Sequence, residues 1–529
     1  MPRISIRTVQ QSRYVHLCHA EKPRSALAEL DRHTSTGKAD PFGSGVLMKS
    51  LKLNVIMNAV RTAASMVFPL ITFPYVSRVL GPEGVGKNNF ALSLVGYFTL
   101  LASIGIPLYG IREVAKTRDD KPALSALVQE LLVLHGVASL GSFLAFIGML
   151  FFNRQMRSEP ALFLVVSISI PLSMLTMEWL YQGLEDYVYI TARSISISAL
   201  SVVALFVFVH RGGDYVVNAA VTVAASLGSS VLNFWNARKF VFARRDRPWQ
   251  FRRHFRPLVT IYALNFIISI YVSLDTVMLG FLSTSQNVGY YSSAVKLTKL
   301  LIAMVTSFGT VLLPRLSYYL SNDRREDFDR MLRKSLGIVL LLCLPIQTAL
   351  MLISRELLEV VAGIQYLPAS GCVVITAPII LAIGLSNIFG FQILYSMSKE
   401  KTFVFSVSVG AVIDVVLNWI LIPRFSHFGA AAATLFAEAA ITALQIVLVR
   451  RFYHVPWPWK NIGKYLLATA SMAGALLGIR WIVPESHLWV RLLVDVPLGA
   501  VLYFLVLHLL GEEFVGEIVT KVRGRLVHA

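Results

Sequence analysis

Cysteine, charge and acidic side chains are all scarce in this 529-residue chain. The three cysteines, Cys18, Cys343 and Cys372, lie far apart in the sequence, which excludes both a disulfide framework and a cysteine-rich metal cluster. Charged residues make up only 15% of the chain, and 30 aspartates and glutamates stand against 49 lysines and arginines. So little charge excludes the ordinary surface of a soluble protein of this length.

Motifs that would supply chemical energy or catalysis are also missing. No phosphate-binding loop of the form GxxxxGK[ST] occurs and no polar segment could form an ATPase domain, so we do not expect ATP to drive this chain. The longest loop predicted on the outer side, residues 354–369, has about sixteen residues, which leaves little room for the catalytic platform of a membrane polymerase or ligase. His135 and His210 have no second ligand at a useful spacing. We therefore expect neither an enzyme nor a bound metal or cofactor.

Apolar residues dominate instead, at 55% of the chain, with a mean hydropathy of +0.63. They recur in runs of about 20 residues, each long enough to cross ~30 Å of hydrocarbon as a helix. Continuous runs rather than strict alternation favour helices over a barrel, so the sequence predicts an all-α polytopic membrane protein. We expect about fourteen transmembrane helices, at residues 54–77, 89–109, 123–152, 161–183, 188–210, 215–236, 258–281, 291–320, 335–353, 370–395, 403–423, 428–449, 461–483 and 488–510.

These helices are expected to form two six-helix lobes. The lobes would span residues 48–236 and 258–450, joined by a basic cytoplasmic linker at 237–257, with two extra helices and a short tail at 451–529. A Val-Gly pair stands five residues before an alanine at 85–86 and again at 288–289. Because six helices separate the copies, the lobes would be parallel repeats about an axis along the membrane normal. Chance matching of small residues is the alternative.

The distribution of basic residues predicts the orientation. With the N-terminus placed in the cytoplasm, 34 of the 49 lysines and arginines lie on the cytoplasmic side, which supports two cytoplasmic termini. The net charge of +19 then reflects topology, and no nucleic-acid partner is expected. Residues 1–47 are polar and basic, and are expected to be a disordered tail. An organellar targeting arm and a natural start at Met48 are the alternatives.

Ionisable residues inside membrane helices usually face a cavity or pair with one another. Lys296 and Lys299 are spaced i, i+3, so both can point into one space. Snorkelling to the membrane surface and structural ion pairing are the alternatives for individual residues. The charged positions in the expected helices lean towards cations, which predicts a cavity for an anion: Arg61, Arg78, Glu178, Arg193, Asp275, Lys296, Lys299 and Asp414.

Residues 68–120, FPLITFPYVSRVLGPEGVGKNNFALSLVGYFTLLASIGIPLYGIREVAKTRDD, closely resemble the opening of the bacterial Wzx-type polysaccharide exporters. These are the O-antigen flippases of the multidrug/oligosaccharidyl-lipid/polysaccharide (MOP) exporter superfamily. LDTVMLGFLSTSQNVGYYSSAVKL and VLLPRLS are similar to the family's helix 7 and 8 region, and the resemblance covers about residues 48–450. It implies two lobes around a central cavity in the bacterial inner membrane. It also implies export of an undecaprenyl-diphosphate-linked oligosaccharide, with a polysaccharide polymerase as a partner.

The resemblance carries over five positions: Arg78, Asp275, and the turn or hinge glycines Gly81, Gly86 and Gly289. The charge argument adds phosphate ligands at Arg61, Arg193, Lys296 and Lys299. Asp275, Glu178 or Asp414 could couple a proton or sodium ion, while the membrane potential is the competing source of energy. Tyr97, Tyr271, Tyr290 and Trp179 could stack on sugar rings, although packing is the common role of such aromatic residues.

Two other functions stay open. A cation-coupled small-molecule exporter of the same superfamily would need acidic rather than basic cavity residues, and the excess of Arg and Lys in the helices disfavours it. A glycan polymerase or ligase would need acid and base residues in external loops, which hold only scattered acids. The sequence predicts no sugar identity and no oligomeric state.

Overall fold

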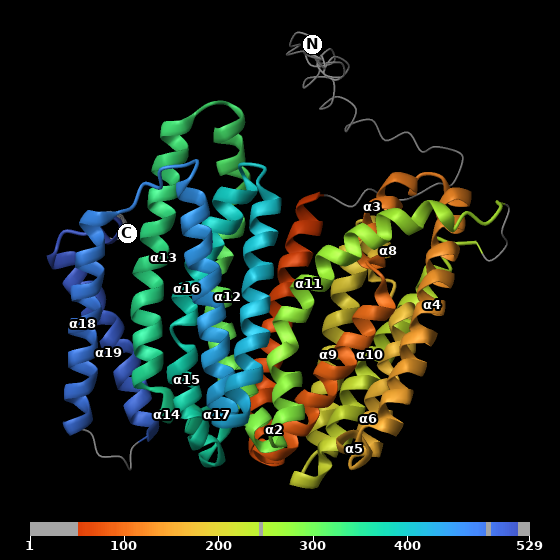
Figure 1. Ribbon diagram of the computed structural model, residues 1–529, viewed down its shortest axis with the longest axis horizontal. Coiled ribbons are helices and arrows are strands. Elements are labelled where there is room, and N and C mark those ends of the chain that lie inside the picture. The colour runs from red at the N-terminus through yellow and green to blue at the C-terminus, as the bar shows by residue number, and fades with distance from the viewer. Residues whose placement is uncertain (1–50, 243–246, 483–487, 517–529) are drawn as a thin grey trace, which may run out of the picture. The chain divides into compact units, whose positions relative to one another are not determined.

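A computed structural model describes residues 51–242, 247–482 and 488–516, and Figure 1 shows their arrangement. Within these ranges the secondary structure consists of helices without strands, and 11 helices are long and apolar enough to cross a membrane. The prediction of an all-α polytopic membrane protein is therefore confirmed. The expected tail at residues 1–47 lies outside the described residues.

The first lobe runs from α2 to α10. Its long helix α2 reverses direction at Gly81, whose φ of 66° and ψ of 177° are accessible only to glycine. The bounds are α2 (Leu51–Ser103), α3 (Ile106–Thr117), α4 (Lys121–Phe152), α5 (Arg154–Arg157), α6 (Pro160–Ser167), α7 (Ser169–Leu172), η1 (Ser173–Leu175), α8 (Glu178–Gly183), α9 (Tyr187–Phe208), η2 (Gly212–Asp214) and α10 (Tyr215–Ala237).

The expected helix at 161–183 is broken in this lobe. Met177 has a φ of 42° and separates η1 from α8, whereas α6, α7 and η1 follow one another through right-handed helical angles. Asn233 of α10 donates a hydrogen bond to the carbonyl of Thr176 at the break. A backbone carbonyl freed inside a membrane must find such a partner, and hydropathy does not register it. A second break, at Gly105 with a φ of 77°, ends the expected helix 89–109 early.

The second lobe runs from α11 to α17 and is followed by two further helices that pack beside α13 (Figure 1). Ser426, with a φ of 50°, divides α17 into two passes, as expected from the sequence. The bounds are α11 (Arg252–Leu282), α12 (Ser285–Ser321), α13 (Arg325–Leu352), α14 (Ser354–Ala362), η3 (Ile364–Ala369), α15 (Ser370–Thr376), α16 (Ile379–Ser386), the π-helix η4 (Asn387–Tyr395), α17 (Glu400–Arg450), α18 (Trp459–Ile482) and α19 (Leu488–Leu509).

Because α2 and α17 each contain two passes and α11 adds another, these elements are compatible with fourteen transmembrane segments. Two predicted boundaries differ from the structure. The segment 354–369 is helical rather than a loop, and α11 begins at Arg252, inside the expected linker 237–257.

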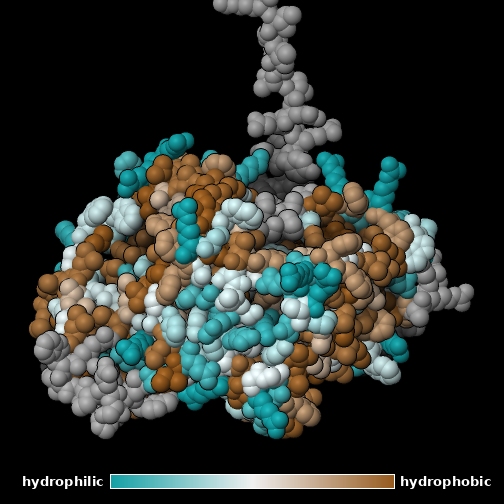
Figure 2. Space-filling model, turned by 60° about the horizontal axis from the view of Figure 1, so that its bottom comes forward, coloured by the Kyte–Doolittle hydropathy of each residue, from teal (hydrophilic) through white to brown (hydrophobic). Residues whose placement is uncertain are grey.

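The outward surface of the helices is apolar. On α4, Val137, Leu140 and Leu144 are 70%, 58% and 60% exposed, and their spacing of three and four residues places them in one stripe. Figure 2 shows hydrophobic residues over the flanks, whereas hydrophilic residues gather on the end turned toward the viewer. An exposed apolar belt of this kind is stable only in contact with lipid.

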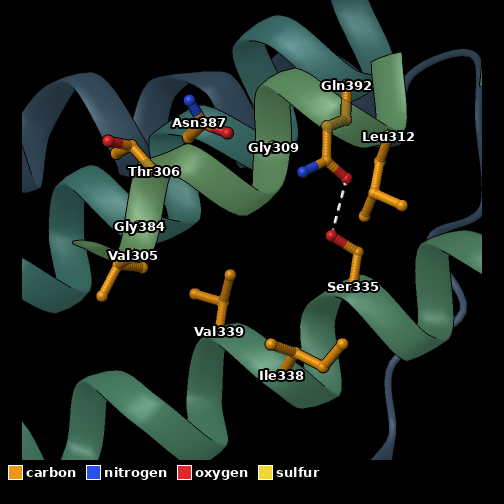
Figure 3. Close-up of a pocket in the computed structure, with 10 residues that line it drawn as sticks. All are labelled: Val305, Thr306, Gly309, Leu312, Ser335, Ile338, Val339, Gly384, Asn387 and Gln392. Carbon is orange, nitrogen blue, oxygen red and sulfur yellow. Dashed lines mark hydrogen bonds between the residues drawn. The ribbon is translucent and has the colours of Figure 1, made fainter. Parts of the chain in front are cut away.

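The π-helix η4 packs against α12 and α13 around a small cavity with both apolar and polar lining residues (Figure 3). Ser335 Oγ donates to Gln392 Oε1 at 2.7 Å. A Cβ on Gly309 would lie 1.9 Å from Asn387 Oδ1, so the Asn387 side chain occupies the space that the absence of a side chain at Gly309 leaves. With about 10 Å³ of space, the cavity has room for no more than one water molecule and serves packing rather than substrate binding.

Helix α11 belongs to both lobes. Near its start, Leu258 packs in a hydrophobic cluster with Ile106 and Tyr109 of the first lobe. Near its end, Asp275 is bonded to Asn418 of α17 in the second lobe. Phe281 and Gly280, in its last turn, contact Phe90 and Gln155 of the first lobe. The start of α11 is therefore fixed in the first lobe, and its end is in contact with both lobes.

Candidate substrate cavity between the lobes

A cavity of about 580 Å³ lies where the two lobes meet. Its walls come from α2, α9 and α10 of the first lobe and from α11 and α12 of the second. A neighbouring cavity of about 520 Å³ shares Leu92, Ser93 and Ser273 with it and continues along α2 past Tyr97 to Ser103. Together the two spaces follow the lobe interface for several helical turns.

Two lysines carry the charge of this cavity. Lys296 and Lys299 of α12 both line it, as their spacing predicted. Lys296 Nζ lies 4.4 Å above the ring centre of Phe73 and forms no ion pair with a carboxylate of the described residues. Across the described parts of the chain, no aspartate or glutamate lines either space. The cavity is therefore cationic and suited to an anion.

The wall contributed mainly by the first lobe carries amides and hydroxyls rather than charge. Asn88, Asn89 and Asn218 line it together with several serines and threonines. Asn88 is only 3% exposed, and neither its Nδ2 nor its Oδ1 has a hydrogen-bond partner among the described residues. Sequence reasoning missed this wall, although adjacent asparagines at 88–89 in an apolar stretch are a signal that could have revealed it.

Close contact between backbones closes one end of the cavity. A Cβ on Gly86 would lie 1.7 Å from the carbonyl oxygen of Ser285, and a Cβ on Gly289 would lie 1.9 Å from that of Pro82. Asn89 Nδ2 donates to Ser292 Oγ at 2.7 Å beside this contact. The two predicted turn glycines thus make reciprocal contacts between the lobes, each against the other lobe's backbone.

Gly81 and Arg78 lie at the same end of the lobe interface. Arg78 donates a hydrogen bond through Nη2 to the carbonyl of Val360 in α14. A Cβ on Gly81 would approach Gln365 Oε1 to 2.7 Å. Neither residue lines the described cavities, so Arg78 is placed as a link between lobes rather than in the cavity wall.

Arg61, Glu178 and Arg193 form a separate charged cluster within the first lobe. Arg193 Nη2 lies 2.5 Å from Glu178 Oε1, and Arg61 Nη1 lies 3.4 Å from Glu178 Oε2. None of the three lines the described cavities. The structure therefore does not bring Arg61 and Arg193 together with the lysines as the charge argument expected, because Glu178 pairs with both arginines.

Asp275 and Asp414 occupy the interior of the second lobe. Asp275 accepts hydrogen bonds from Asn418 Nδ2 at 2.7 Å, the Tyr291 hydroxyl at 2.5 Å and Thr434 Oγ1 at 3.0 Å. Asp414, one helical turn before Asn418, is fully buried and interacts electrostatically with Asp275. Sequence reasoning identified both carboxyls but missed Asn418, Tyr291 and Thr434. A lone proton or a monovalent cation suits such a pair of carboxyls. In the described residues, no group of three His, Cys, Asp or Glu side chains that could hold a metal ion occurs.

The aromatic residues expected to stack on sugar rings also differ in where the structure places them. Tyr97 lines the neighbouring cavity, whereas Tyr290 and Trp179 are 7% and 3% exposed and pack in the interior. The side chain of Tyr271 lies outside the described residues. Of the three candidates whose side chains are described, Tyr97 is the one that lines a described cavity.

Family models match two parts of the chain. A model described as polysaccharide biosynthesis protein matches residues 51–320, just over half of the sequence. The chain belongs to this polysaccharide biosynthesis protein family. A second model, described as MatE, matches residues 261–420 of this family member, within the lobe that holds Asp275 and Asp414.

Individual relatives agree with the family. A protein of Escherichia coli (strain K12) described as an O-antigen transporter is 24% identical over 409 residues, covering 76% of this chain and 97% of its own length. The lipid II flippase MurJ in an inward closed conformation superposes with a TM-score of 0.67 at 14% identity, covering 88% of this chain and 100% of MurJ. An inward-facing MATE transporter of the MOP superfamily gives 0.59 at 14% identity, covering 75% and 97%. This polysaccharide biosynthesis protein therefore has the MOP fold, and the resemblance found in the sequence is confirmed.

Proposed function

We propose that this protein flips an undecaprenyl-diphosphate-linked oligosaccharide from the cytoplasmic to the periplasmic leaflet of the bacterial inner membrane for polysaccharide synthesis. The observation that carries this proposal is the cavity between the lobes, with Lys296 and Lys299 on one wall and uncharged amides and hydroxyls on the other. A lipid diphosphate can leave its acyl chain in the bilayer, but its phosphates and sugars lose their water in hydrocarbon. The lysines would replace that water at the phosphates, and the amides would replace it at the sugar hydroxyls.

Movement would follow alternating access. With both termini in the cytoplasm, the contact of Gly86 and Gly289 closes the periplasmic end of the cavity. Rocking of one lobe against the other would separate this contact and release the glycan to the periplasm, where a polysaccharide polymerase is the proposed next partner. Membership of the polysaccharide biosynthesis family and the names of its relatives support this role.

The energy source is proposed to be a proton or sodium ion bound at Asp275 and Asp414. Charge repulsion between two buried carboxyls is relieved by one bound cation, so occupancy would alter the packing of α11 against α17. Export by vesicles should then follow an imposed pH or sodium gradient, and Asp414→Asn should remove that dependence. A response to membrane potential alone, unchanged in this variant, would assign the energy to the substrate charge instead, at about 2.3 kcal/mol per charge per 100 mV.

The substrate assignment is tested by the double variant Lys296→Gln, Lys299→Gln. A charge-assisted hydrogen bond contributes about 1.5–3 kcal/mol, so losing two should reduce transport at least tenfold. Lipid-linked oligosaccharide should then accumulate on the cytoplasmic face of cells that carry only this variant. Lys399→Gln, an exposed lysine outside the cavity, serves as the matched control. Normal export by the correctly inserted double variant would refute the role of the lysines.

A cation-coupled small-molecule exporter is the second candidate, because the MatE match covers the lobe with the buried carboxyls. Cationic drugs would need acidic residues in the cavity wall, and the described lining residues include none. Deletion of the gene should therefore leave resistance to cationic drugs unchanged. Hypersensitivity to such drugs without loss of polysaccharide would favour this candidate.

A further inference from the structure

A second polar cavity, of about 400 Å³, lies among α3, α4 and the chain that leads into α11. It shares no lining residue with the lysine cavity or its neighbour. Its lining includes Arg112 and Glu113 of α3, Glu130 of α4, and residues from Arg247 to Pro257. Nothing in the proposed transport cycle uses this space.

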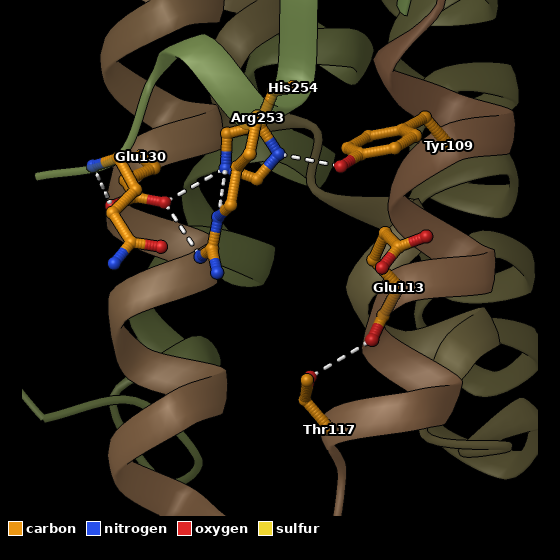
Figure 4. A network of polar contacts seen from close by, with 7 residues as sticks. Tyr109, Glu113, Thr117, Glu130, Arg253 and His254 are labelled. Atoms are coloured by element: carbon orange, nitrogen blue, oxygen red, sulfur yellow. Dashed lines mark hydrogen bonds and ion pairs between the residues drawn. The ribbon is translucent and has the colours of Figure 1, made fainter. Parts of the chain in front are cut away.

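The floor of this cavity is a buried polar network (Figure 4). Glu130 is fully buried and accepts hydrogen bonds from the backbone N–H of Gln250 at 2.7 Å and from Arg253 Nη2 at 2.8 Å. His254 Nε2 lies 2.8 Å from the same carboxylate, and its Nδ1 lies 2.6 Å from the Tyr109 hydroxyl. Glu130 therefore fixes the chain entering α11 against α4, and the cavity is bounded by side chains already held in place.

Three arginines from different segments surround this floor. Arg112 uses Nε for Glu113 at 3.0 Å, while its two Nη atoms make no hydrogen bond or ion pair with the described residues. Arg247 pairs with Asp120 at 2.9 Å and is about half exposed. With Arg253, three guanidinium groups line the cavity beside two acidic lining residues, Glu113 and Glu130, while Asp120, the partner of Arg247, lies outside the lining. The planar donors of Arg112 and of the half-exposed Arg247 at the rim fit a phosphate group, which would replace Asp120 as the partner of Arg247.

Aromatic side chains flank the same segment and are exposed. Trp249 is 51% exposed and stacks on Phe251 at 5.1 Å, while Phe242 and Phe255 are 50% and 71% exposed. Aromatic rings beside arginines at the end of membrane helices are typical of the headgroup layer. On the predicted cytoplasmic side this layer is anionic, and basic cavities between helices there bind lipid headgroups.

We propose that this cavity binds the phosphate of an anionic phospholipid of the cytoplasmic leaflet. Arg112 and Arg247 hold the phosphate, the exposed aromatic residues lie among the neighbouring headgroups, and Glu130 keeps the site assembled through Arg253 and His254. The lipid is an additional ligand, distinct from the transported glycan, and it attaches the start of α11 to the membrane surface.

The test is equilibrium binding of fluorescent phosphatidylglycerol to the delipidated full-length protein. Phosphatidylglycerol should bind at least tenfold more tightly than phosphatidylcholine, and Arg112→Gln with Arg247→Gln should weaken it about tenfold or more. Arg118→Gln is the matched control, because Arg118 pairs with Glu185 at 3.1 Å on the same side and does not line the cavity. If the glutamine variant fails to fold, Arg112→Lys with Arg247→Lys takes its place. This lysine variant keeps the charge and should retain most of the binding.

Three outcomes would overturn the proposal. Equal binding of phosphatidylcholine would show that the phosphate charge is not recognised. Displacement by inorganic phosphate at the affinity of the lipid would assign the site to soluble phosphates. Loss of binding in Lys296→Gln, Lys299→Gln but not in the arginine variants would place the lipid in the transport cavity. Since none of these measurements requires transport, failure here leaves the proposed flippase activity untouched.

Discussion

The contact of Gly86 with Gly289 predicts how this protein responds to one added methyl group. In Gly86→Ala the new Cβ would lie 1.7 Å from the carbonyl oxygen and 2.7 Å from the carbonyl carbon of Ser285. Both atoms belong to backbone, so no side-chain rotation can relieve the overlap. The lobes must separate at this end by more than an ångström, or the helices must deform.

The size of the effect follows from overpacking. Forcing a methyl group into a filled contact costs about 1–3 kcal/mol. Because this contact exists only while this end of the cavity is closed, the whole cost falls on the closed state. A two-state equilibrium between closed and open forms would therefore shift about 5- to 150-fold towards the open form.

Spin labels at exposed positions in the two lobes can measure this shift. Ser158 after α5 and Ile364 in η3 are both exposed, and labels there would report the separation of the lobes at the Gly86 end. Cys343 and Cys372 are buried, but they and Cys18 would be replaced before labelling. The distance distribution of Gly86→Ala should gain a longer component relative to the parent protein.

Gly141→Ala is the matched control, because a Cβ there would meet nothing within 4 Å. It should leave the distribution unchanged. An unchanged distribution in Gly86→Ala, with normal export, would refute the assignment of this contact as a gate. Gly289→Ala should reproduce the effect, since its Cβ would lie 1.9 Å from the Pro82 carbonyl oxygen.

Four further substitutions test three other charged residues. Glu178→Gln leaves Arg193 buried without its carboxylate and should reduce the free energy of unfolding by about 3 kcal/mol. This value is the low end for a broken buried ion pair, because the Glu178 side chain is 39% exposed. Urea unfolding in detergent measures the change, and an unchanged free energy would contradict the pairing. Arg78→Ala removes the bond to the Val360 carbonyl and should lower export severalfold without affecting membrane insertion; full export would make Arg78 a structural residue. Asp275→Ala should impair export with insertion retained, and Asp275→Asn should keep its hydrogen bonds to Tyr291 and Thr434 but not ion coupling.

Hydropathy predicted the passes but not their interruptions. The helix at 123–152 matches α4 within two residues at its start, because its apolar run ends in polar caps such as Asp120 and Asn153. The breaks at Met177 and Gly105 depend on positive φ angles held by distant partners such as Asn233. A periodic pattern contains no information about such partners, so the expected helices at 89–109 and 161–183 were too regular.

The sequence also predicted the position of some charged side chains but not of others. Lys296 and Lys299 could be assigned to one cavity because their spacing on one helix fixes their direction. Arg61 and Arg193 could not, since their direction depends on Glu178, which is 117 residues from Arg61 in the chain. Asp275 was identifiable as a buried carboxyl, but its partners Asn418 and Thr434 come from α17 and required the fold.

The double attachment of α11 has a mechanical consequence. Its start is bonded to the first lobe through His254 and packed there through Leu258, while Asp275 is bonded to α17 of the second lobe. A rod fixed at both ends cannot follow two bodies that rotate relative to each other unless it bends between the fixed points. The stretch of α11 from Leu258 to Asp275 would therefore have to bend if the lobes rotate as proposed. We expect the stiffness of this stretch to oppose that rotation, independently of how tightly a substrate binds.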